Sequence, residues 1–272
     1  MREFIKTLIP EEYRLLRYEL YERARYFPEL VFSLGKKFEC PFCRWRFRRL
    51  RPAGFNYPVL EKRKVVGASF HLNDVCPRCL SNSRERLAYL YLMANKDLFS
   101  RKQTLLHIAP EPNLGKLLSE AKNIQYISGD LYEPDVMCQL DITQLAFADN
   151  SFDVVICNHV LEHVSNDKLA MTELYRILKP GGWAMVQVPI AMALERTLED
   201  PTATTEEQRI ELFGQRDHVR LYAQNDYIDR LRSIGFQVCP DSFGRSLPEA
   251  DVMRYSLIPE EVVFVCTKEG VM

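Results

Sequence analysis

Ser-Phe-Asp-Val-Val-Ile-Cys-Asn-His-Val-Leu-Glu-His occupies residues 151–163, and Glu-Leu-Tyr-Arg-Ile-Leu-Lys-Pro-Gly-Gly occupies residues 173–182. The apolar run 152–157 has the length of a buried strand, the segment 166–178 has a helical pattern, and a second strand-length run covers 183–189. A strand, a helix and another strand in this order are typical of a unit with two parallel strands. The quoted stretches therefore predict an α/β protein.

The same alternation extends on both sides of this segment. Further strand-length runs cover 104–109, 124–128, 236–239 and 262–266, and further helical segments cover 112–121 and 224–234. Such a chain predicts a Rossmann-like fold, with a mostly parallel sheet covered by helices on both faces. We expect four parts along it: a helical segment over 1–35 with an amphipathic helix at 10–34, a small zinc-ribbon-like module with short hairpins over 36–82, a linking helix over 83–102, and the Rossmann-like domain over 103–272.

The composition is that of a soluble globular protein, because 47% of the 272 residues are hydrophobic and 27% are charged. No apolar run approaches the ~20 residues that span a bilayer. The N-terminus also lacks the pattern of a secretory signal, so we expect a cytoplasmic protein without a membrane partner. The net charge of −1 gives no general reason to bind nucleic acid, but ten Lys or Arg and only two Glu lie between Lys36 and Lys64. This local excess of basic residues indicates a binding partner for the stretch or another structural reason.

Four of the eight cysteines form two Cys-x-x-Cys pairs, Cys40 with Cys43 and Cys76 with Cys79. Two such pairs can surround one Zn²⁺ tetrahedrally and hold together a segment too small to have its own core. Four thiolates leave no open position for a substrate, which favours a structural metal; chance clustering of reduced thiols is the alternative. His71 is interpreted as a surface residue rather than a ligand. The other four cysteines lie singly in apolar runs and are expected in the core: Cys138, Cys157, Cys239 and Cys266.

The two stretches quoted first closely resemble the fourth strand and the approach to the fifth strand of class I S-adenosylmethionine-dependent methyltransferases. The segment 141–147, Asp-Ile-Thr-Gln-Leu-Ala-Phe, resembles the loop that flanks adenine in that family, and the resemblance spans about residues 103–268. Residues 107–111, His-Ile-Ala-Pro-Glu, and residues 213–222, Phe-Gly-Gln-Arg-Asp-His-Val-Arg-Leu-Tyr, resemble motifs of a bacterial subgroup that also carries the two cysteine pairs. The resemblance implies transfer of a methyl group from S-adenosylmethionine.

The expected cofactor site follows from the ends of the strands. Ligands of an open α/β sheet bind beyond the carboxyl ends of the strands, so Asp130 is placed to accept the ribose hydroxyls, with Leu131 beside it. Turn or helix capping is the alternative for Asp130 and Asp141. The resemblance implies further contacts along the cofactor: Asp141 and Ile142 at the adenine, and Asn158 and His159 near the methionine part and the methyl group.

The loop after the first strand of the domain departs from the family. Where the family carries an acidic residue and a Gly-x-Gly turn, this chain has Leu-Leu-His-Ile-Ala-Pro-Glu-Pro-Asn at 105–113. Glycines let the backbone approach a ligand closely. We expect His107, Ala109 and Glu111 to replace them, with Glu111 receiving the amino group of the cofactor. A scaffold that binds no cofactor is the alternative.

Candidate catalytic groups lie after the fourth strand and in the polar loop 191–222. His218 beside Asp217 is the leading general base, and His163 is a second candidate. Arg220 and Tyr222 are expected to bind the acceptor, Arg220 through a carboxylate or phosphate. Salt bridges among surface residues, or a structural role for His163, are the alternatives.

Two acceptor classes remain open at this stage. The first is a polar small molecule or saccharide that is methylated on oxygen or nitrogen. The second is an RNA base, with the basic residues of the cysteine-containing module gripping the phosphate backbone. The acidic pI near 6.5 favours the first class.

Overall fold

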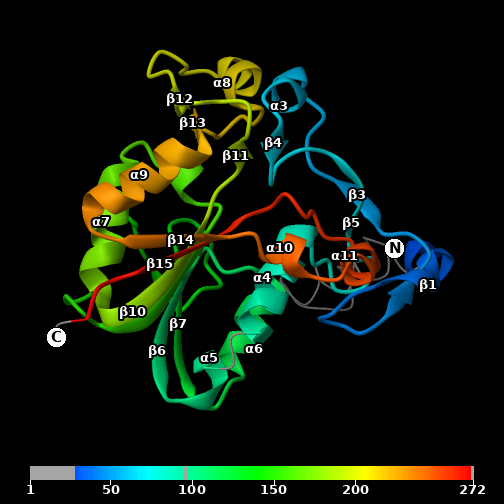
Figure 1. Cartoon of the computed structure of the whole chain (residues 1–272), viewed down its shortest axis with the longest axis horizontal. Coiled ribbons are helices and arrows are strands. Elements are labelled where there is room, and N and C mark those ends of the chain that lie inside the picture. The colour runs from blue at the N-terminus through cyan, green and yellow to red at the C-terminus, as the bar shows by residue number, and fades with distance from the viewer. Residues whose placement is uncertain (1–27, 95–96, 271–272) are drawn as a thin grey trace, which may run out of the picture.

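The computed structural model describes residues 28–94 and 97–270. Most of the helix expected at 10–34 lies outside these residues, although 28–33 are helical. The core of the molecule is one seven-stranded sheet with the order β14-β15-β10-β9-β6-β7-β8 (Figure 1). Its strands are β6 Gln103–Ile108, β7 Ile124–Asp130, β8 Cys138–Gln139, β9 Phe152–Asn158, β10 Leu178–Gln187, β14 Gln237–Asp241 and β15 Val263–Thr267.

The sheet confirms the predicted α/β class. Strands β6 to β10 pair in parallel, and β15 runs antiparallel to both of its neighbours, β10 and β14. The chain builds the sheet outward from β6 through β7 to β8 and then returns to the other side of β6 with β9. The strand order therefore reverses between β6 and β9, which is where ligands bind in open α/β sheets.

Helices cover both faces of the sheet because successive strand residues point to opposite sides. On one face, Leu106 and Val155 pack with side chains of α7 and α9; on the other, Leu105 and Val154 pack with side chains of α4 and α6. The single linking helix expected over 83–102 is described as two pieces, α4 and α5. The helices are α4 Ser83–Ala94, α5 Asp97–Ser100, α6 Pro112–Ser119, α7 Asp167–Ile177, α9 Gln224–Ile234, α10 Phe243–Ser246 and α11 Glu249–Tyr255.

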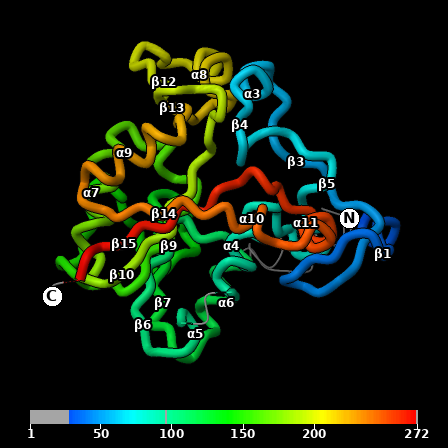
Figure 2. Tube along the Cα trace, viewed as in Figure 1, coloured from blue at the N-terminus to red at the C-terminus, as the bar shows by residue number. Residues whose placement is uncertain are grey.

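The N-terminal module contains the expected short hairpins. Strands β1 Leu34–Glu39 and β2 Arg46–Phe47 pair with each other, as do β3 Arg51–Ala53 and β5 His71–Val75. Between the last two, α3 Pro58–Lys62 and β4 Val65–Val66 cross to the larger domain, where β4 pairs with β11 Ile190–Ala191. Figure 2 follows this crossing along the Cα trace. The middle of the module is thus attached to the larger domain next to the end of β10.

The loop expected at 191–222 carries short elements of its own. It contains β12 Leu198–Glu199, α8 Glu206–Phe213 and β13 Arg220–Leu221, and β12 pairs with β13. Phe213 and Leu221 are buried with Leu60 of α3 in one apolar cluster, so this loop and the module support each other. No helix in the described ranges has the length and apolarity to cross a membrane. Of the four single cysteines, Cys157 and Cys266 are buried, Cys138 is half-buried, and Cys239 is exposed, which corrects its placement in the core.

Candidate active site

Hydrogen bonds around Glu111 join the carboxyl ends of β6 and β9. His107 of β6 is fully buried, and its Nε2 lies 2.7 Å from Oε2 of Glu111. Nδ2 of Asn158, the last residue of β9, donates to Oε1 of Glu111 at 3.0 Å. Burial alone would raise the pKa of Glu111, but these two hydrogen bonds hold it below its usual value. A carboxylate therefore sits where the strand order reverses.

The backbone at the ends of these two strands is left-handed. Ala109 has φ +49° and His159 has φ +56°. The N–H of Ala109 donates to the carbonyl of Gly129 in β7 at 2.8 Å. A left-handed residue usually is glycine, and strained non-glycine residues concentrate at functional sites. Ala109 thus takes the backbone conformation that a glycine would supply in this turn.

Asp130 and Leu131 lie at the end of β7. Oδ1 of Asp130 accepts hydrogen bonds from the N–H groups of Tyr132 at 2.7 Å and Glu133 at 2.9 Å, so one oxygen caps the turn. The half-buried Asp130 side chain keeps its second oxygen outside these bonds, and the side chain of Leu131 is exposed. The capping interpretation and the ribose interpretation therefore use different oxygens of the same carboxylate.

Asp141 and Ile142 follow β8 in the next loop. Asp141 is exposed, and its Oδ1 accepts from Oγ1 of Thr143 at 2.6 Å and from the N–H of Thr143 at 2.8 Å. These bonds, led by the hydroxyl, lower the pKa of Asp141. Ile142 is buried in the core on the α7 side of the sheet. The hydrogen bonds of Asp141 and the burial of Ile142 thus hold this turn in place.

A second polar group, the Glu–His–His cluster of Glu162, His163 and His218, lies after β9. Glu162 and His163 belong to a 3₁₀ turn, η2 Leu161–His163, and His218 comes from the loop after α8. One ligand-type atom from each residue lies within 4.8 Å of the other two. The rings of His163 and His218 meet edge to face with centroids 4.8 Å apart. Nδ1 of His163 also lies 3.4 Å from Oδ2 of Asp217. The structure therefore brings all three predicted catalytic residues together.

The charges in this cluster are set by burial and by His159. Nδ1 of His159 lies 3.4 Å from Oε1 of Glu162. Burial opposes the charge on Glu162, but this contact and the neighbouring imidazoles lower its pKa to about 2. Burial lowers the pKa of His218 to about 4, so its imidazole is neutral at pH 7. A base with so low a pKa is a weak proton acceptor, which reduces its value as the general base.

Arg220 and Tyr222 are buried in the protein. Arg220 is 3% exposed; it donates to the carbonyls of Leu161 at 2.8 Å, Ser165 at 2.9 Å and also Val164. Its Nε donates to Glu199 at 2.7 Å, and the hydroxyl of Tyr222 donates to Asp167 at 2.8 Å. Arg230 bridges Glu199 and Asp167 at 2.8 and 2.9 Å. In this structure the Arg220 network holds η2 in place, and its donors are occupied by the protein itself.

The linking helix α4 and the N-terminal module each contact this region at one point. Glu85 of α4 accepts hydrogen bonds from the N–H groups of Asn113 at 2.9 Å and Leu114 at 3.0 Å, which caps the start of α6 beside Glu111. Gly67, with φ +91°, lies against His159, since a Cβ there would be 3.6 Å from Cε1 of the imidazole. The α4 helix and the module therefore each help to shape one end of the candidate site.

Sequence reasoning missed three residues of this arrangement. Glu162 belongs to a Leu-Glu-His triplet that is frequent in the resembled family whichever acceptor is methylated. The triplet therefore gave no reason to predict a role for Glu162, and only His163 was a candidate. Glu85 lies in α4 and Gly67 lies in the module, and their approach to α6 and His159 depends on the tertiary fold. The one sequence signal for Glu162 is a carboxylate beside His163, three residues after His159.

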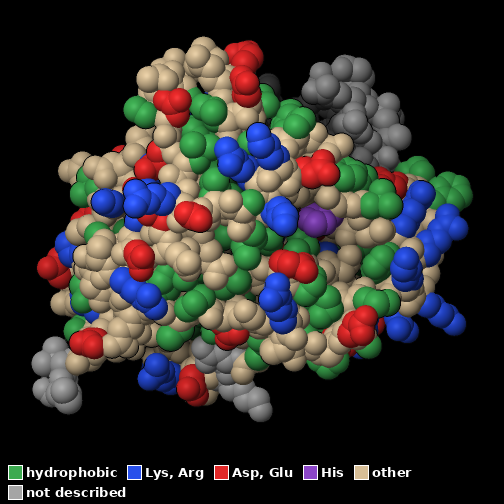
Figure 3. Space-filling view, turned by 45° about the horizontal axis from the view of Figure 1, so that its top comes forward, with side chains coloured by type: hydrophobic (Ala, Val, Ile, Leu, Met, Phe, Trp, Pro, Cys, Tyr) green, Lys and Arg blue, Asp and Glu red, His purple; other side chains and the backbone are tan. Residues whose placement is uncertain are grey.

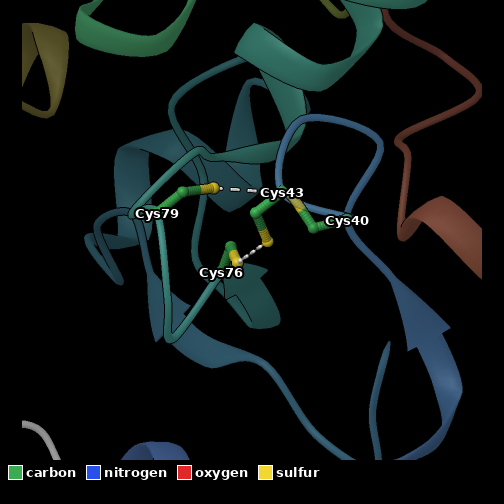
Figure 4. Close-up of side chains that lie close together, drawn as sticks. All are labelled: Cys40, Cys43, Cys76 and Cys79. Atoms are coloured by element: carbon green, nitrogen blue, oxygen red, sulfur yellow. Dashed lines mark hydrogen bonds between the residues drawn. The ribbon is translucent and has the colours of Figure 1, made fainter. Parts of the chain in front are cut away.

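The four paired cysteines form a compact cluster (Figure 4). Sγ of Cys40 lies 3.4 Å from Sγ of Cys79, and Sγ of Cys43 lies 3.7 Å from Sγ of Cys76. These distances are too long for disulfides and match the ~3.8 Å expected between sulfurs around a tetrahedral ion with bonds of about 2.3 Å. All four residues therefore fit one tetrahedral thiolate site.

The basic stretch of the sequence lies at the surface of the module. Figure 3 shows Lys and Arg side chains gathered at the edge of the molecule that carries β1. The guanidinium of Arg78 also stacks over the ring of Trp45 at 4.3 Å. The exposed basic residues of this surface, called the basic patch, are Lys36, Lys37, Arg44, Arg46, Arg48 and Arg49.

Residues 97–186 match the family model described as a methyltransferase domain. The uncharacterized protein YafE of Escherichia coli is 33% identical over 84 residues, which are 31% of this chain and 38% of YafE. The thiol S-methyltransferase TMT1B of Rattus norvegicus is 34% identical over 103 residues, which are 34% of this chain and 39% of that protein. The chain thus spans less than two fifths of the length of these curated relatives.

Among solved structures, a SAM-dependent methyltransferase from Archaeoglobus fulgidus is 16% identical, with a TM-score of 0.45 over 69% of this chain and 95% of that one. The family model and the two named relatives each match about a third of this chain. The matched residues run from α5 to β10 and include the Glu111 and Asn158 link as well as the Glu–His–His residues Glu162 and His163.

Proposed function

We propose that the protein is an S-adenosylmethionine-dependent methyltransferase that methylates an oxygen or nitrogen of a polar small molecule or saccharide. The observation that carries this proposal is the hydrogen bond between Asn158 and Glu111, which spans the point where strand order reverses between β6 and β9. The methyltransferase-domain match over the same strands supports the chemistry. The bound cofactor supplies a methyl group on a positively charged sulfur, so the chain mainly has to align donor and acceptor.

Each end of the cofactor has a partner of suitable chemistry in this proposal. Glu111, charged and reached from the surface, binds the amino group, and His107 and Asn158 hold its carboxylate in place. Asp130 offers the ribose hydroxyls the oxygen that does not cap the turn. The exposed carboxylate of Asp141 and the neighbouring Ile142 border the adenine. Ala109 and His159 shape the backbone around the methionine part.

The polar acceptor is supported by the side chains after β9. The Glu–His–His cluster and Asp217 present charged and hydrogen-bonding groups next to His159, and the side chain of His163 is 34% exposed. A polar acceptor can replace water at such groups without leaving them unpaired, whereas an apolar one cannot. In this proposal Arg220 and Tyr222 position η2 and do not contact the acceptor.

We also propose that the cysteine cluster binds one structural Zn²⁺. The two knuckles fold alike, since the N–H of Arg44 donates to the carbonyl of Cys40 at 2.8 Å and that of Leu80 donates to Cys76 at 3.0 Å. Arg44 and Leu80 both have a left-handed backbone. Four thiolates close the coordination sphere, so the metal would hold the module rather than take part in the reaction.

The basic patch supports RNA as a second acceptor class. Its exposed Lys and Arg side chains could hold a phosphate backbone while a base enters the site. In that case affinity for a short RNA falls steeply as salt rises, and substitution of Arg46 and Arg48 by Ala reduces the slope. A binding curve without salt dependence would leave only the small-molecule acceptor.

Calorimetry with S-adenosylhomocysteine tests the cofactor assignment. We expect the full chain to bind it and Asp130→Ala to weaken binding by roughly 10–100-fold, because a charged hydrogen bond contributes about 1.5–3 kcal/mol. Asp135→Ala is the matched control, since Asp135 is an exposed acid in the same loop. Failure of the unchanged protein to bind would overturn the enzyme, and equal affinity of Asp130→Ala and Asp135→Ala would overturn the ribose contact.

A further inference from the structure

We propose that Glu162, His163 and His218 form a second metal site, one that binds a divalent cation with open coordination positions at the acceptor side of the candidate active site. One ligand-type atom from each residue lies within 4.8 Å of the other two. The residues come from two separate segments, η2 and the loop after α8, which the fold brings to one point.

The first argument is a buried carboxylate with one unpaired oxygen. Glu162 is 2% exposed, and its Oε2 has no hydrogen-bond partner. Across residues 28–94 and 97–270, no Lys or Arg forms an ion pair with it, and its ion-pair contact is with His159 at 3.4 Å. A buried charge without a cation is costly, so buried charges in proteins are paired or bind metals.

The second argument is a buried imidazole with an unpaired nitrogen in the same cluster. His218 is 1% exposed, and its Nδ1 finds no hydrogen-bond partner in the described part of the chain. A buried ring nitrogen of this kind loses its hydrogen bond to water on folding unless a ligand replaces the water. An imidazole nitrogen and a carboxylate oxygen left unsatisfied in one cluster are complementary to one cation.

The third argument is that the ligands are held by neighbours. The N–H of Val219 donates to the carbonyl of Glu162 at 2.9 Å, which ties the loop of His218 to η2. Arg220 holds the carbonyl of Leu161 from the same loop, and Asp217 contacts Nδ1 of His163 at 3.4 Å. Metal ligands are usually oriented by such contacts to a carboxylate or a carbonyl.

The donor set indicates the kind of ion. Two imidazoles and one carboxylate suit Mn²⁺, Fe²⁺, Co²⁺ or Zn²⁺ better than Ca²⁺ or Mg²⁺, which prefer oxygen ligands. Three protein ligands leave positions for an exogenous group, as in catalytic metal sites. The half-exposed His163 gives that group access.

The role of the ion rests on the proposed function. A hydroxyl group of the acceptor that binds the ion has a lowered pKa, and its proton passes to water. The oxygen then forms a bond to the methyl carbon with its own electron pair, while the carbon–sulfur bond breaks and leaves its electrons on sulfur. The ion would therefore activate the hydroxyl directly, while His218 serves as one of its ligands.

Mn²⁺ titration of the full chain, followed by electron paramagnetic resonance, tests the site. Mn²⁺ is a hard ion that disfavours the thiolates of the cysteine cluster. We expect one Mn²⁺ to bind per chain, with nitrogen modulation in pulsed spectra from the imidazoles. Glu162→Gln and His163→Asn each weaken binding by at least about tenfold. His163→Asn changes a partly exposed side chain, so it tests the site even where Glu162→Gln fails to fold.

His71→Ala is the matched control, because it removes a histidine in the module and should leave Mn²⁺ affinity unchanged. Equal affinity of His163→Asn and His71→Ala, or no binding by the unchanged protein, would overturn the metal site. S-adenosylhomocysteine binding is measured separately on the same samples. Mn²⁺ binding without S-adenosylhomocysteine binding would support the metal site and overturn the proposed function. S-adenosylhomocysteine binding without Mn²⁺ binding would support the proposed function and overturn the metal site.

Discussion

The molecule contains two clusters of metal-ligand side chains that are built in opposite ways. The cysteine cluster comes from two local turns with the same pattern of hydrogen bonds, and its sulfurs already stand 3.4 and 3.7 Å apart in pairs. The Glu–His–His cluster has three ligands instead of four, and it joins two unlike segments, η2 and the loop after α8. The four thiolates can fill the coordination sphere of one ion, whereas the three ligands of the Glu–His–His cluster leave coordination positions open.

The two clusters differ in whether the metal would hold the chain in place or the fold would hold the metal. Around the cysteine cluster the buried apolar set is small, with Phe38, Phe47 and Leu50 beside the cysteines, so a metal would hold this part of the chain together. In the Glu–His–His cluster the Arg220 network, β13 and the core behind η2 hold the ligands, so the fold would hold the metal. Loss of the metal should therefore have different consequences at the two places.

The largest expected effect is loss of the module in Cys76→Ser. Structural zinc sites contribute on the order of 10 kcal/mol to folding, so removal of one thiolate should abolish stoichiometric zinc and the protection of amides over residues 36–82. Zinc analysis and hydrogen exchange measure both. Cys239→Ser is the control, because Cys239 is an exposed thiol outside the cluster. Full amide protection of the module in metal-free Cys76→Ser would show that packing alone folds it.

A smaller effect is expected when the support of the open cluster is removed. Arg220→Ala leaves three backbone carbonyls without their buried donor and removes one of the two guanidinium groups that pair with Glu199, which should lower the free energy of unfolding by about 3 kcal/mol. Arg220→Lys should recover little of this, because an ammonium cannot reproduce the fork of contacts. Chemical denaturation measures the change, and Arg196→Ala on the exposed face of the same loop is the control.

We expect zinc content to stay unchanged in Arg220→Ala while Mn²⁺ affinity falls, which would show that the two clusters are held independently. The cysteine turns lie outside the Arg220 network, whereas η2 depends on it directly. A parallel loss of both metals would show that the two regions fold as one unit and would contradict the division drawn above.

The repeating apolar runs were sufficient to predict the sheet. Every strand-length run of the domain forms a strand within a few residues of the expected limits, because buried parallel strands are continuously apolar. The linking helix and the crossing of β4 to β11 were harder. Pairing of Val65 with Ala191 depends on contacts between distant parts of the chain, which local patterns do not record.

The residues of the candidate sites also divide into those that local sequence predicts and those that depend on the tertiary fold. The cysteine pairs were readable because their spacing is a local property of a turn, and the end of β9 was readable because strand ends converge. Arg220 looked like an acceptor contact, but its charge is satisfied by carbonyls of η2 and by Glu199. Glu162 was overlooked because a carboxylate is conspicuous only once its burial is known.

Glu261 lies where the module meets the candidate site and should have the smallest of these effects. It is 6% exposed, its Oε1 would lie 3.7 Å from a Cβ at Gly67, and its Oε2 has no hydrogen-bond partner among the described residues. Burial raises its pKa to about 7 despite the nearby Arg84, so the folded protein keeps a proton that the unfolded chain releases. Stability should therefore fall by up to about 3 kcal/mol as pH rises from about 4.5 to 7, and level off above that.

Glu261→Gln should remove this part of the pH dependence, because an amide stays neutral throughout the range. Denaturation midpoints between pH 5 and 8 measure it, and Glu260→Gln is the control, since its neighbouring carboxylate is exposed. We expect the curve of Glu260→Gln to keep the slope of the unchanged protein and that of Glu261→Gln to be flatter. Parallel curves for all three proteins would mean that Glu261 is charged in the folded state. The boundary between the two regions would then contain an ion pair with Arg84 instead of a neutral acid.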